Sequence, residues 1–133
     1  MSEEANLELA RRALDAWNAG DLDALVAFCH PEYELHTSGV YPGLKPVYRG
    51  PQGLREFWRD WAELWEELVL EVEDLQAEDD RVLALVTFRA RGREGIEVRR
   101  PAANLSVVRD GLVLRQSMYG SWEEGRQAAG LEG

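Results

Sequence analysis

The sequence predicts an α+β domain in which helices come first and strands follow. Apolar residues recur at three- and four-residue steps near the N-terminus and again around residues 54–68, which is typical of amphipathic helices. The second half instead alternates apolar and polar residues between short turn motifs, which indicates antiparallel strands. This order favours helices packed on one face of a curved sheet.

Three helices are predicted in the first half. The first has Ser2 as its N-cap and Gly20 as its C-terminal stop. Asp21 caps a second, short helix that ends at His30-Pro31, because proline lacks a backbone donor. Pro51 suits the first position of a third helix. The apolar stripe of this helix is unusually aromatic and consists of Leu54, Phe57, Trp58, Trp61, Leu64, Trp65 and Leu68.

The strands are predicted from alternation and from the turns between them. Residues 32–37 form the first strand, and residues 38–50 form an ordered loop that is long enough to act as a pocket lid. Four more extended segments follow the third helix, at residues 68–76, 82–91, 96–109 and 112–122. Residues 123–133 are expected to form a short helical or frayed tail.

Composition narrows the classes of function. The 133 residues fit one domain over residues 1–133, and the net charge of -10 argues against nucleic-acid and anionic-membrane partners. No segment approaches the roughly 18 continuous apolar residues of a membrane span, and the start is not a signal sequence, so a cytoplasmic protein is expected. The lone Cys29 cannot form an internal disulfide. Without a zinc, phosphate-loop or nucleophile-elbow motif, no metal or cofactor is predicted.

Several local motifs, taken with this order of elements, resemble the NTF2-like superfamily, especially its SnoaL-like and ketosteroid-isomerase-like members. The motifs are Asn18-Ala19-Gly20-Asp21-Leu22-Asp23, Gly53-Leu54-Arg55-Glu56-Phe57-Trp58, Asp110-Gly111 and Tyr119-Gly120. The resemblance implies a cone-shaped fold, in which three N-terminal helices pack on a curved, mainly antiparallel sheet and enclose a pocket. Because the superfamily includes isomerases, polyketide cyclases and purely oligomerising domains, only the pocket residues can decide the function.

The resemblance also implies a candidate general base. An acidic base occupies the first strand in the ketosteroid-isomerase-like pattern, and the matching position here is His36. Imidazole, with an ordinary pKa of about 6.5, suits proton abstraction beside a carbonyl near neutral pH. Glu34 lies on the same strand face and could hold or tune His36, although their contact is left open. The family's oxyanion donors match Ala13 and Ala103, which cannot donate from their side chains, so steroid isomerisation is not expected.

Further candidates come from the helices and the last strands. Trp17 and Trp58 match pocket-lining positions of the resembled family, whereas Trp61 and Trp65 are expected in the core. Arg115 is expected to stabilise a developing enolate or bind a carboxylate, with Asn104 as an alternative. The predicted site therefore has His36 and Arg115 as catalytic residues and Trp17, Glu34, Tyr41, Trp58, Asn104, Ser117 and Tyr119 as ligand-binding residues.

Two functions remain open at this point. The first is a protein that binds a small, largely apolar molecule, with cofactor-independent isomerase, cyclase or dehydratase chemistry at His36 if it is an enzyme. The second is a non-catalytic ligand-binding or assembly domain, which the alanines at the oxyanion positions favour. Both faces of the predicted strand at residues 82–91 are apolar, which indicates a covered outer sheet face and a homodimer through the sheet.

Overall fold

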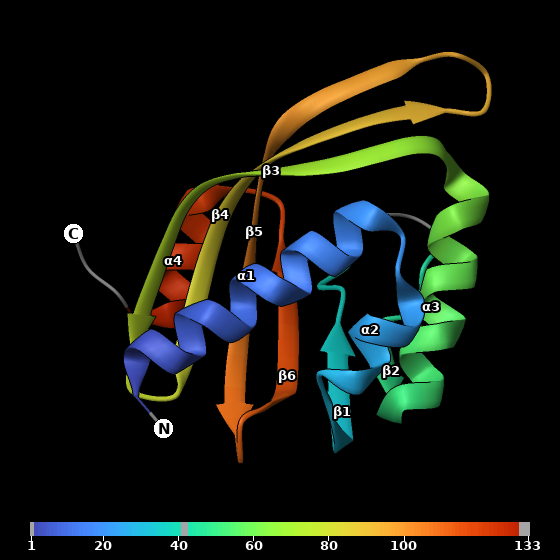
Figure 1. Ribbon diagram of the computed structural model, residues 1–133. Coiled ribbons are helices and arrows are strands. Elements are labelled where there is room, and N and C mark those ends of the chain that lie inside the picture. The colour runs from blue at the N-terminus through green and yellow to red at the C-terminus, as the bar shows by residue number, and fades with distance from the viewer. Residues whose placement is uncertain (1, 41–42, 131–133) are drawn as a thin grey trace.

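The architecture is that of a computed structural model, which describes residues 2–40 and 43–130 (Figure 1). The helices are α1 (Glu3–Ala19), α2 (Leu22–Ala27), α3 (Gly50–Leu64) and α4 (Trp122–Ala129). The strands are β1 (Cys29–His36), β2 (Val47–Arg49), β3 (Trp65–Glu78), β4 (Arg81–Gly92), β5 (Glu97–Arg109) and β6 (Leu112–Tyr119). The predicted α+β class, with helices packed on a curved sheet, is confirmed.

The six strands form one sheet in the order β2-β1-β6-β5-β4-β3. All neighbours are antiparallel except β1 and β6, which run parallel and set Glu34 opposite Arg115 and His36 opposite Ser117. Register shifts interrupt β3 after Val72 and the β5–β6 pairing after Val107. Such bulges bend strands, so they contribute to the curvature that leaves room under the helices.

Local sequence sets the position of α1. Its N-cap Ser2 accepts a hydrogen bond from the Ala5 amide through Oγ, and Gly20 ends it in a left-handed conformation with φ 71°. Near that end, the Asn18 side chain accepts from the Leu70 amide and donates to the Leu70 carbonyl, each at 2.9 Å. Asn18 therefore ties α1 to β3, an edge strand of the sheet.

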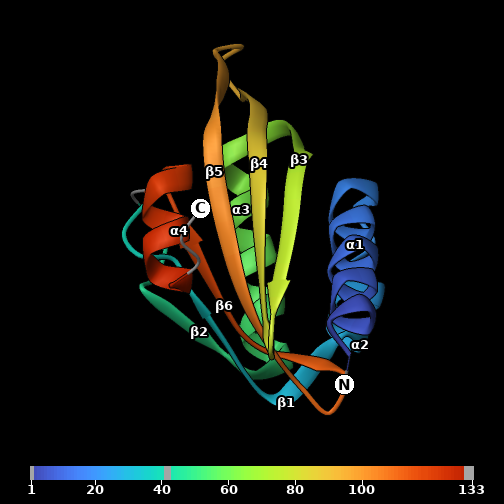
Figure 2. The same ribbon diagram turned by 90° about the vertical axis from the view of Figure 1, so that its left-hand side faces the viewer.

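The two faces of the sheet are covered by different helices of the same chain. Figure 2 shows α1 on one side of the strands and α4 on the other. Within β4, the side chains of Ala84 and Val86 pack into the core under α1 and α3, whereas Leu83 and Leu85 pack with Ala129 of α4. The apolar outer face that suggested a partner chain is therefore covered at β4 by α4, most of which lies within the predicted tail at residues 123–133.

The last strand ends at Tyr119 instead of residue 122, and three further differences from the sequence prediction concern the first half of the chain and the start of β3. The third helix ends at Leu64 instead of continuing to Leu68, because the chain pairs with β4 from Trp65 onward. The expected loop contains the short strand β2, whose Tyr48 pairs with Leu35 of β1. The first strand begins at Cys29 rather than at residue 32. In these three cases long-range strand pairing overrides local propensity, which is a weak determinant. Within the described residues, no helix is both long and apolar enough to cross a membrane.

Candidate functional site

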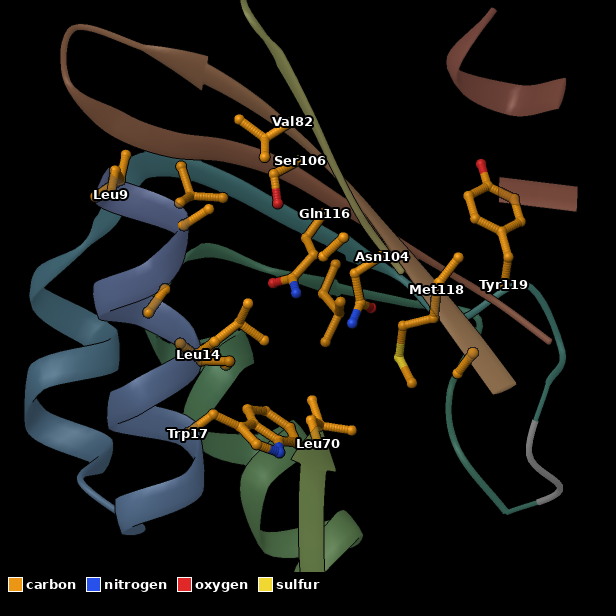
Figure 3. Close-up of a pocket in the computed structure, with 18 of the residues that line it drawn as sticks. Leu9, Leu14, Trp17, Leu70, Val82, Asn104, Ser106, Gln116, Met118 and Tyr119 are labelled. Atoms are coloured by element: carbon orange, nitrogen blue, oxygen red, sulfur yellow. The ribbon is translucent and has the colours of Figure 1, made fainter. Parts of the chain in front are cut away.

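A cavity of about 80 Å³ lies between α1, α3 and the inner face of the sheet (Figure 3). This is several times the roughly 10–15 Å³ that one water needs. From the helices, its lining includes Asn6, Leu9, Ala10, Ala13, Leu14, Trp17, Leu54, Phe57 and Trp61. From the strands, it includes Leu35, Leu70, Val82, Ala84, Phe88, Ala102, Ala103, Asn104, Ser106, Val108, Val113, Gln116, Met118 and Tyr119.

One end of the cavity has an aromatic wall. The rings of Phe57 and Trp61 stack with centroids 5.4 Å apart, and Trp17 and Phe88 lie 6.2 and 5.7 Å from Trp61. Trp58 packs edge-on against Trp17 at 5.0 Å and is not among the lining residues. Aromatic groups packed at these separations hold each other in place, so this wall is preformed.

A polar row crosses the opposite wall, and it consists of Asn104, Ser106 and Gln116. Ser106 and Gln116 are directly paired across β5 and β6, and Asn104 lies two residues from Ser106 on the same face. Figure 3 shows these side chains on the sheet side of the space, facing Leu14 and Trp17 of α1. The row therefore places hydrogen-bonding groups in a cavity that is otherwise almost entirely apolar.

The row keeps unused hydrogen-bonding capacity. The hydroxyl of Tyr33, a buried residue of β1, donates to Oε1 of Gln116 at 2.9 Å. Burial raises the pKa of Tyr33 well above its ordinary value, and the nearby Cys29 raises it further, so the hydroxyl keeps its proton. The Gln116 NH₂ group remains a donor. Among the described residues, the Asn104 amide and the Ser106 hydroxyl have no hydrogen-bond partner.

The cavity lacks ionised side chains. Its lining, as far as the structure describes it, contains no Asp, Glu, His, Lys, Arg or Cys, and Tyr119 is its only ionisable residue. Cys29 lies beside the core, where burial raises its thiol pKa to about 12 and makes it a poor nucleophile. Nor do three His, Cys, Asp or Glu side chains of the described chain converge on a metal position. The polar groups of the described lining are therefore neutral hydrogen-bonding groups.

The structure divides the residues predicted for the site. Trp17, Asn104 and Tyr119 line the cavity, and Tyr119 lies at its edge in Figure 3. Trp58 supports the wall from behind. Tyr41 lies outside the described residues. The remaining four residues do not line the cavity; they are Glu34, His36, Arg115 and Ser117.

The prediction that His36 points into the cavity is wrong. Tyr33 and Leu35 are almost completely buried, at 1% and 2% exposure, and Leu35 lines the cavity. Because successive strand residues face opposite sides, Glu34 and His36 lie on the outer face. Large apolar side chains at the odd positions decide this phase, since their burial stabilises the fold.

His36 instead belongs to a charged cluster on the outer face. Its Nε2 lies 2.9 Å from Oε1 of Glu34, so these two side chains do meet, and Arg49 Nε lies 3.6 Å from the other Glu34 oxygen. The hydrogen bond from His36 lowers the pKa of Glu34, with smaller contributions from the charges of Arg49 and Arg115. Arg115 faces Glu34 across the parallel pairing of β1 and β6. The cluster therefore lies on the outer face of β2, β1 and β6 and is not part of the cavity lining.

Sequence reasoning missed Ser106, Gln116 and the supporting Tyr33. A usable pattern was present, because Asn104 and Ser106 share a strand face with Ala102, and Gln116 alternates with Arg115 and Ser117. That pattern identifies side chains on a common face. Which face is inside depends on the packing of α1, α3 and α4, and this packing turns Gln116, rather than Arg115 and Ser117, toward the cavity.

The fold and cavity define a helix-covered, cone-shaped α+β domain of the NTF2-like superfamily. Residues 10–116 match the SnoaL-like domain family, and the chain belongs to it. The resemblance seen in the sequence is thereby confirmed. No curated protein matches the chain.

Solved structures of the same fold are similar over nearly the whole chain. An NTF2-like protein of unknown function from Burkholderia pseudomallei is 18% identical with a TM-score of 0.83, covering 96% of this chain and 97% of its own. TerC, co-crystallised with polyporic acid, is 19% identical with a TM-score of 0.81, covering 92% and 96%. A putative polyketide cyclase from Xanthomonas campestris is 21% identical with a TM-score of 0.77, covering 92% and 94%. At these identities the likeness concerns the fold.

Proposed function

We propose that this SnoaL-like domain binds a small, largely apolar molecule whose polar group is held by Asn104, Ser106 and Gln116. One observation carries the proposal: three neighbouring polar side chains retain free donors or acceptors inside an apolar cavity. Polar groups removed from water are costly unless they are hydrogen-bonded. A ligand that pairs with the row would satisfy groups that the protein leaves open.

The orientation of Gln116 specifies part of this ligand. The Gln116 oxygen already accepts a hydrogen bond from the Tyr33 hydroxyl. The group that Gln116 can offer to a ligand is therefore its NH₂ donor. A hydrogen-bond acceptor such as a carbonyl, ether or hydroxyl oxygen therefore suits this position. Trp17 and the apolar residues of α1 face the row across the cavity and suit the hydrocarbon part. The similar fold of TerC, co-crystallised with polyporic acid, is consistent with a small-molecule ligand.

Binding without an ionised catalytic residue fits this cavity best. His36 and Arg115, the predicted base and charge stabiliser, do not line it, so isomerase, cyclase or dehydratase chemistry through them has no support from the geometry. Tyr119 and Asn104 remain as neutral groups that contact a ligand. The alternative predicted from the alanines at positions 13 and 103, a non-catalytic binding domain, is therefore the one we adopt.

The homodimer and the cytoplasmic location stay predictions from the sequence. Part of the argument for a dimer falls away, because α4 covers Leu83 and Leu85 on the outer face. Sedimentation equilibrium of the purified chain measures its mass directly, and a monomer at micromolar concentration would contradict the dimer.

The test of ligand binding uses 2-phenylethanol, which joins an apolar ring to one hydroxyl group, and ethylbenzene as the matched probe without the hydroxyl. We expect 2-phenylethanol to bind the wild-type protein in titrations followed by ¹H–¹⁵N NMR, with shifts concentrated at β5, β6 and α1. Gln116→Leu should lower the affinity for 2-phenylethanol about tenfold, which is the loss expected for a hydrogen bond of about 1.4 kcal/mol. The affinity for ethylbenzene should not change.

Ala13→Phe provides the steric control, because Ala13 lines the cavity from α1 and a larger side chain there would occupy the space. This variant should abolish binding of both probes while the far-ultraviolet circular dichroism spectrum stays that of a folded protein. Binding that survives Ala13→Phe would place the ligand elsewhere and overturn the proposal, as would the absence of binding to the wild-type protein.

A further inference from the structure

The polar row has two ends that lie at different places in the cavity. Ser106 and Gln116 are directly opposite each other across β5 and β6, so their side chains share one end. Asn104 is paired with Met118 and forms the other end, one diagonal step along the sheet. Diagonal neighbours of this kind are about 7–8 Å apart. In Figure 3 the side chains of Gln116 and Asn104 enter the space separately, with Asn104 nearer to Met118. The row therefore offers a ligand two hydrogen-bonding positions.

The end at Gln116 is fixed as a donor. Its oxygen already accepts a hydrogen bond from Tyr33 at 2.9 Å, which leaves the NH₂ group for a ligand. The hydroxyl of Ser106, on the opposite strand, can also donate there. An oxygen acceptor suits this end, because its lone pairs can accept from both groups.

The end at Asn104 is not fixed. Among the described residues, none forms a hydrogen bond with its amide. Unlike the enclosed Oδ1 of Asn6, the Asn104 amide has accessible surface in the cavity. The torsion that turns an asparagine amide is broad and roughly two-fold, so the oxygen and the nitrogen can exchange places. This end can therefore accept from a hydroxyl or donate to a carbonyl.

The volume of the cavity limits the molecular body that joins the two positions. Its 80 Å³ amounts to about six times the space that one water occupies, which is room for a single six-membered ring. The rings of Trp17, Phe57 and Trp61 at the aromatic wall suit the apolar surface of such a ring. One ring with polar groups at its opposite ends therefore spans the row.

We propose that the ligand carries two polar groups on opposite sides of one ring, an oxygen acceptor bound by Gln116 and a hydroxyl or carbonyl group bound by Asn104. This inference rests on the proposed function and adds the number and the spacing of the polar groups. Two groups on neighbouring ring atoms would both lie at one end of the row. The other end would then lose contact with water without gaining a partner, which lowers affinity.

The experiment uses three probes with the same ring. Anisole has one oxygen, and the isomers 4-methoxyphenol and 2-methoxyphenol have two, with the hydroxyl either across the ring from the methoxy oxygen or next to it. Dissociation constants are measured by ¹H–¹⁵N NMR titration for the wild type, Asn104→Leu and Gln127→Leu. Leucine has nearly the shape of asparagine without its hydrogen-bonding groups, and Gln127 is an exposed residue of α4 that serves as the control position.

We expect 4-methoxyphenol to bind the wild-type protein about tenfold more tightly than anisole, which is the gain from one hydrogen bond. The affinity for 2-methoxyphenol should be close to that for anisole. In Asn104→Leu the advantage of 4-methoxyphenol should disappear while anisole still binds, which also shows that the cavity is intact. Gln127→Leu should keep the full advantage.

The opposite results separate the two proposals. Equal binding of anisole and 4-methoxyphenol to the wild type, or equal binding of the two isomers, overturns the second polar group while the ligand cavity stands. An advantage of 4-methoxyphenol that persists in Asn104→Leu likewise overturns it. The isomer comparison needs only the wild-type protein, so it decides even where the variant does not fold. Failure of all three probes to bind overturns the proposed function together with this inference.

Discussion

The Tyr33 hydroxyl donates a hydrogen bond to Oε1 of Gln116 across the parallel pairing of β1 and β6, over a distance of 2.9 Å. Tyr33 itself is 1% exposed, and its raised pKa keeps the hydroxyl protonated. The bond thus links a core residue to the polar row and determines which end of the Gln116 amide can meet a ligand. The supporting residue is as important as the lining residue, because it fixes the direction of the donor.

Tyr33→Phe should therefore affect both stability and ligand selection. The variant leaves the Gln116 oxygen without its partner, which should lower the free energy of unfolding by about 1–2 kcal/mol in urea titrations. It should also lower the affinity for 2-phenylethanol relative to that for ethylbenzene, because the Gln116 amide is no longer held in one orientation. Tyr48→Phe is the matched control. The Tyr48 hydroxyl donates to Asp60 at 2.7 Å, and neither residue lines the cavity. The free energy of unfolding should therefore fall while the ratio of the affinities for 2-phenylethanol and ethylbenzene stays the same.

Asn18→Asp should loosen the contact between α1 and β3. The aspartate keeps an acceptor for the Leu70 amide but places an oxygen against the Leu70 carbonyl, where Asn18 now donates at 2.9 Å. We expect a loss of about 1–3 kcal/mol in the free energy of unfolding at pH 7. Amide hydrogen exchange should accelerate at Leu70 in particular. Asp15→Asn, at an exposed position of the same helix, should change neither quantity, and equal effects from both variants would contradict this role of Asn18.

Gly125→Ala tests the close packing of α4 on the sheet. A Cβ at Gly125 would lie 2.5 Å from the Ala103 Cβ and 3.2 Å from Cδ1 of Leu83, so α4 must shift outward. The expected cost is about 1–3 kcal/mol, despite the better helix propensity of alanine. Gly120→Ala is the control, since its nearest new contact is an ordinary 3.8 Å. A thermal midpoint for Gly125→Ala at or above that of the wild type would show that α4 is loosely held.

Glu34 should contribute a part of the acid sensitivity of folding. Hydrogen bonding by His36, assisted by Arg49, lowers its pKa in the folded protein below the ordinary 4.5. A folded-state pKa below the unfolded one means that folding stabilises the ionised form. The contribution is therefore complete above pH 4.5 and is lost as the pH falls through the folded-state pKa.

Urea titrations of Glu34→Gln between pH 6 and pH 3 measure this effect. The variant should be less stable than the wild type at pH 6, and the difference should narrow as the pH decreases. Glu32→Gln removes an exposed carboxylate from the same strand and forms the comparison. If the difference in the free energy of unfolding between the wild type and Glu34→Gln stays constant over this pH range, the coupling of Glu34 to His36 is contradicted.

Much of the fold was predictable because its determinants are local. Ser2 and Gly20 cap α1, Asp21 caps α2 by accepting from the Ala24 amide, and these two helices lie where the apolar periodicity indicates. The end of the third helix was not predictable in the same way. Helical spacing continues through Trp65 and Leu68, yet strand pairing with β4 takes over at Trp65. Pairing energy comes from residues distant in sequence, so no local pattern contains it.

The residues of the candidate site likewise fall into those that were predictable from the sequence and those that were not. The local motifs and the periodicity were enough to predict the family and the main order of elements, and Trp17, Asn104 and Tyr119 were among the residues predicted from them that line the cavity. The outward position of His36 and the inward position of Gln116 depend instead on the packing of the helices on the sheet. Alternation assigns residues to two faces, whereas the burial of Tyr33 and Leu35 under the helices determines which face is the inside.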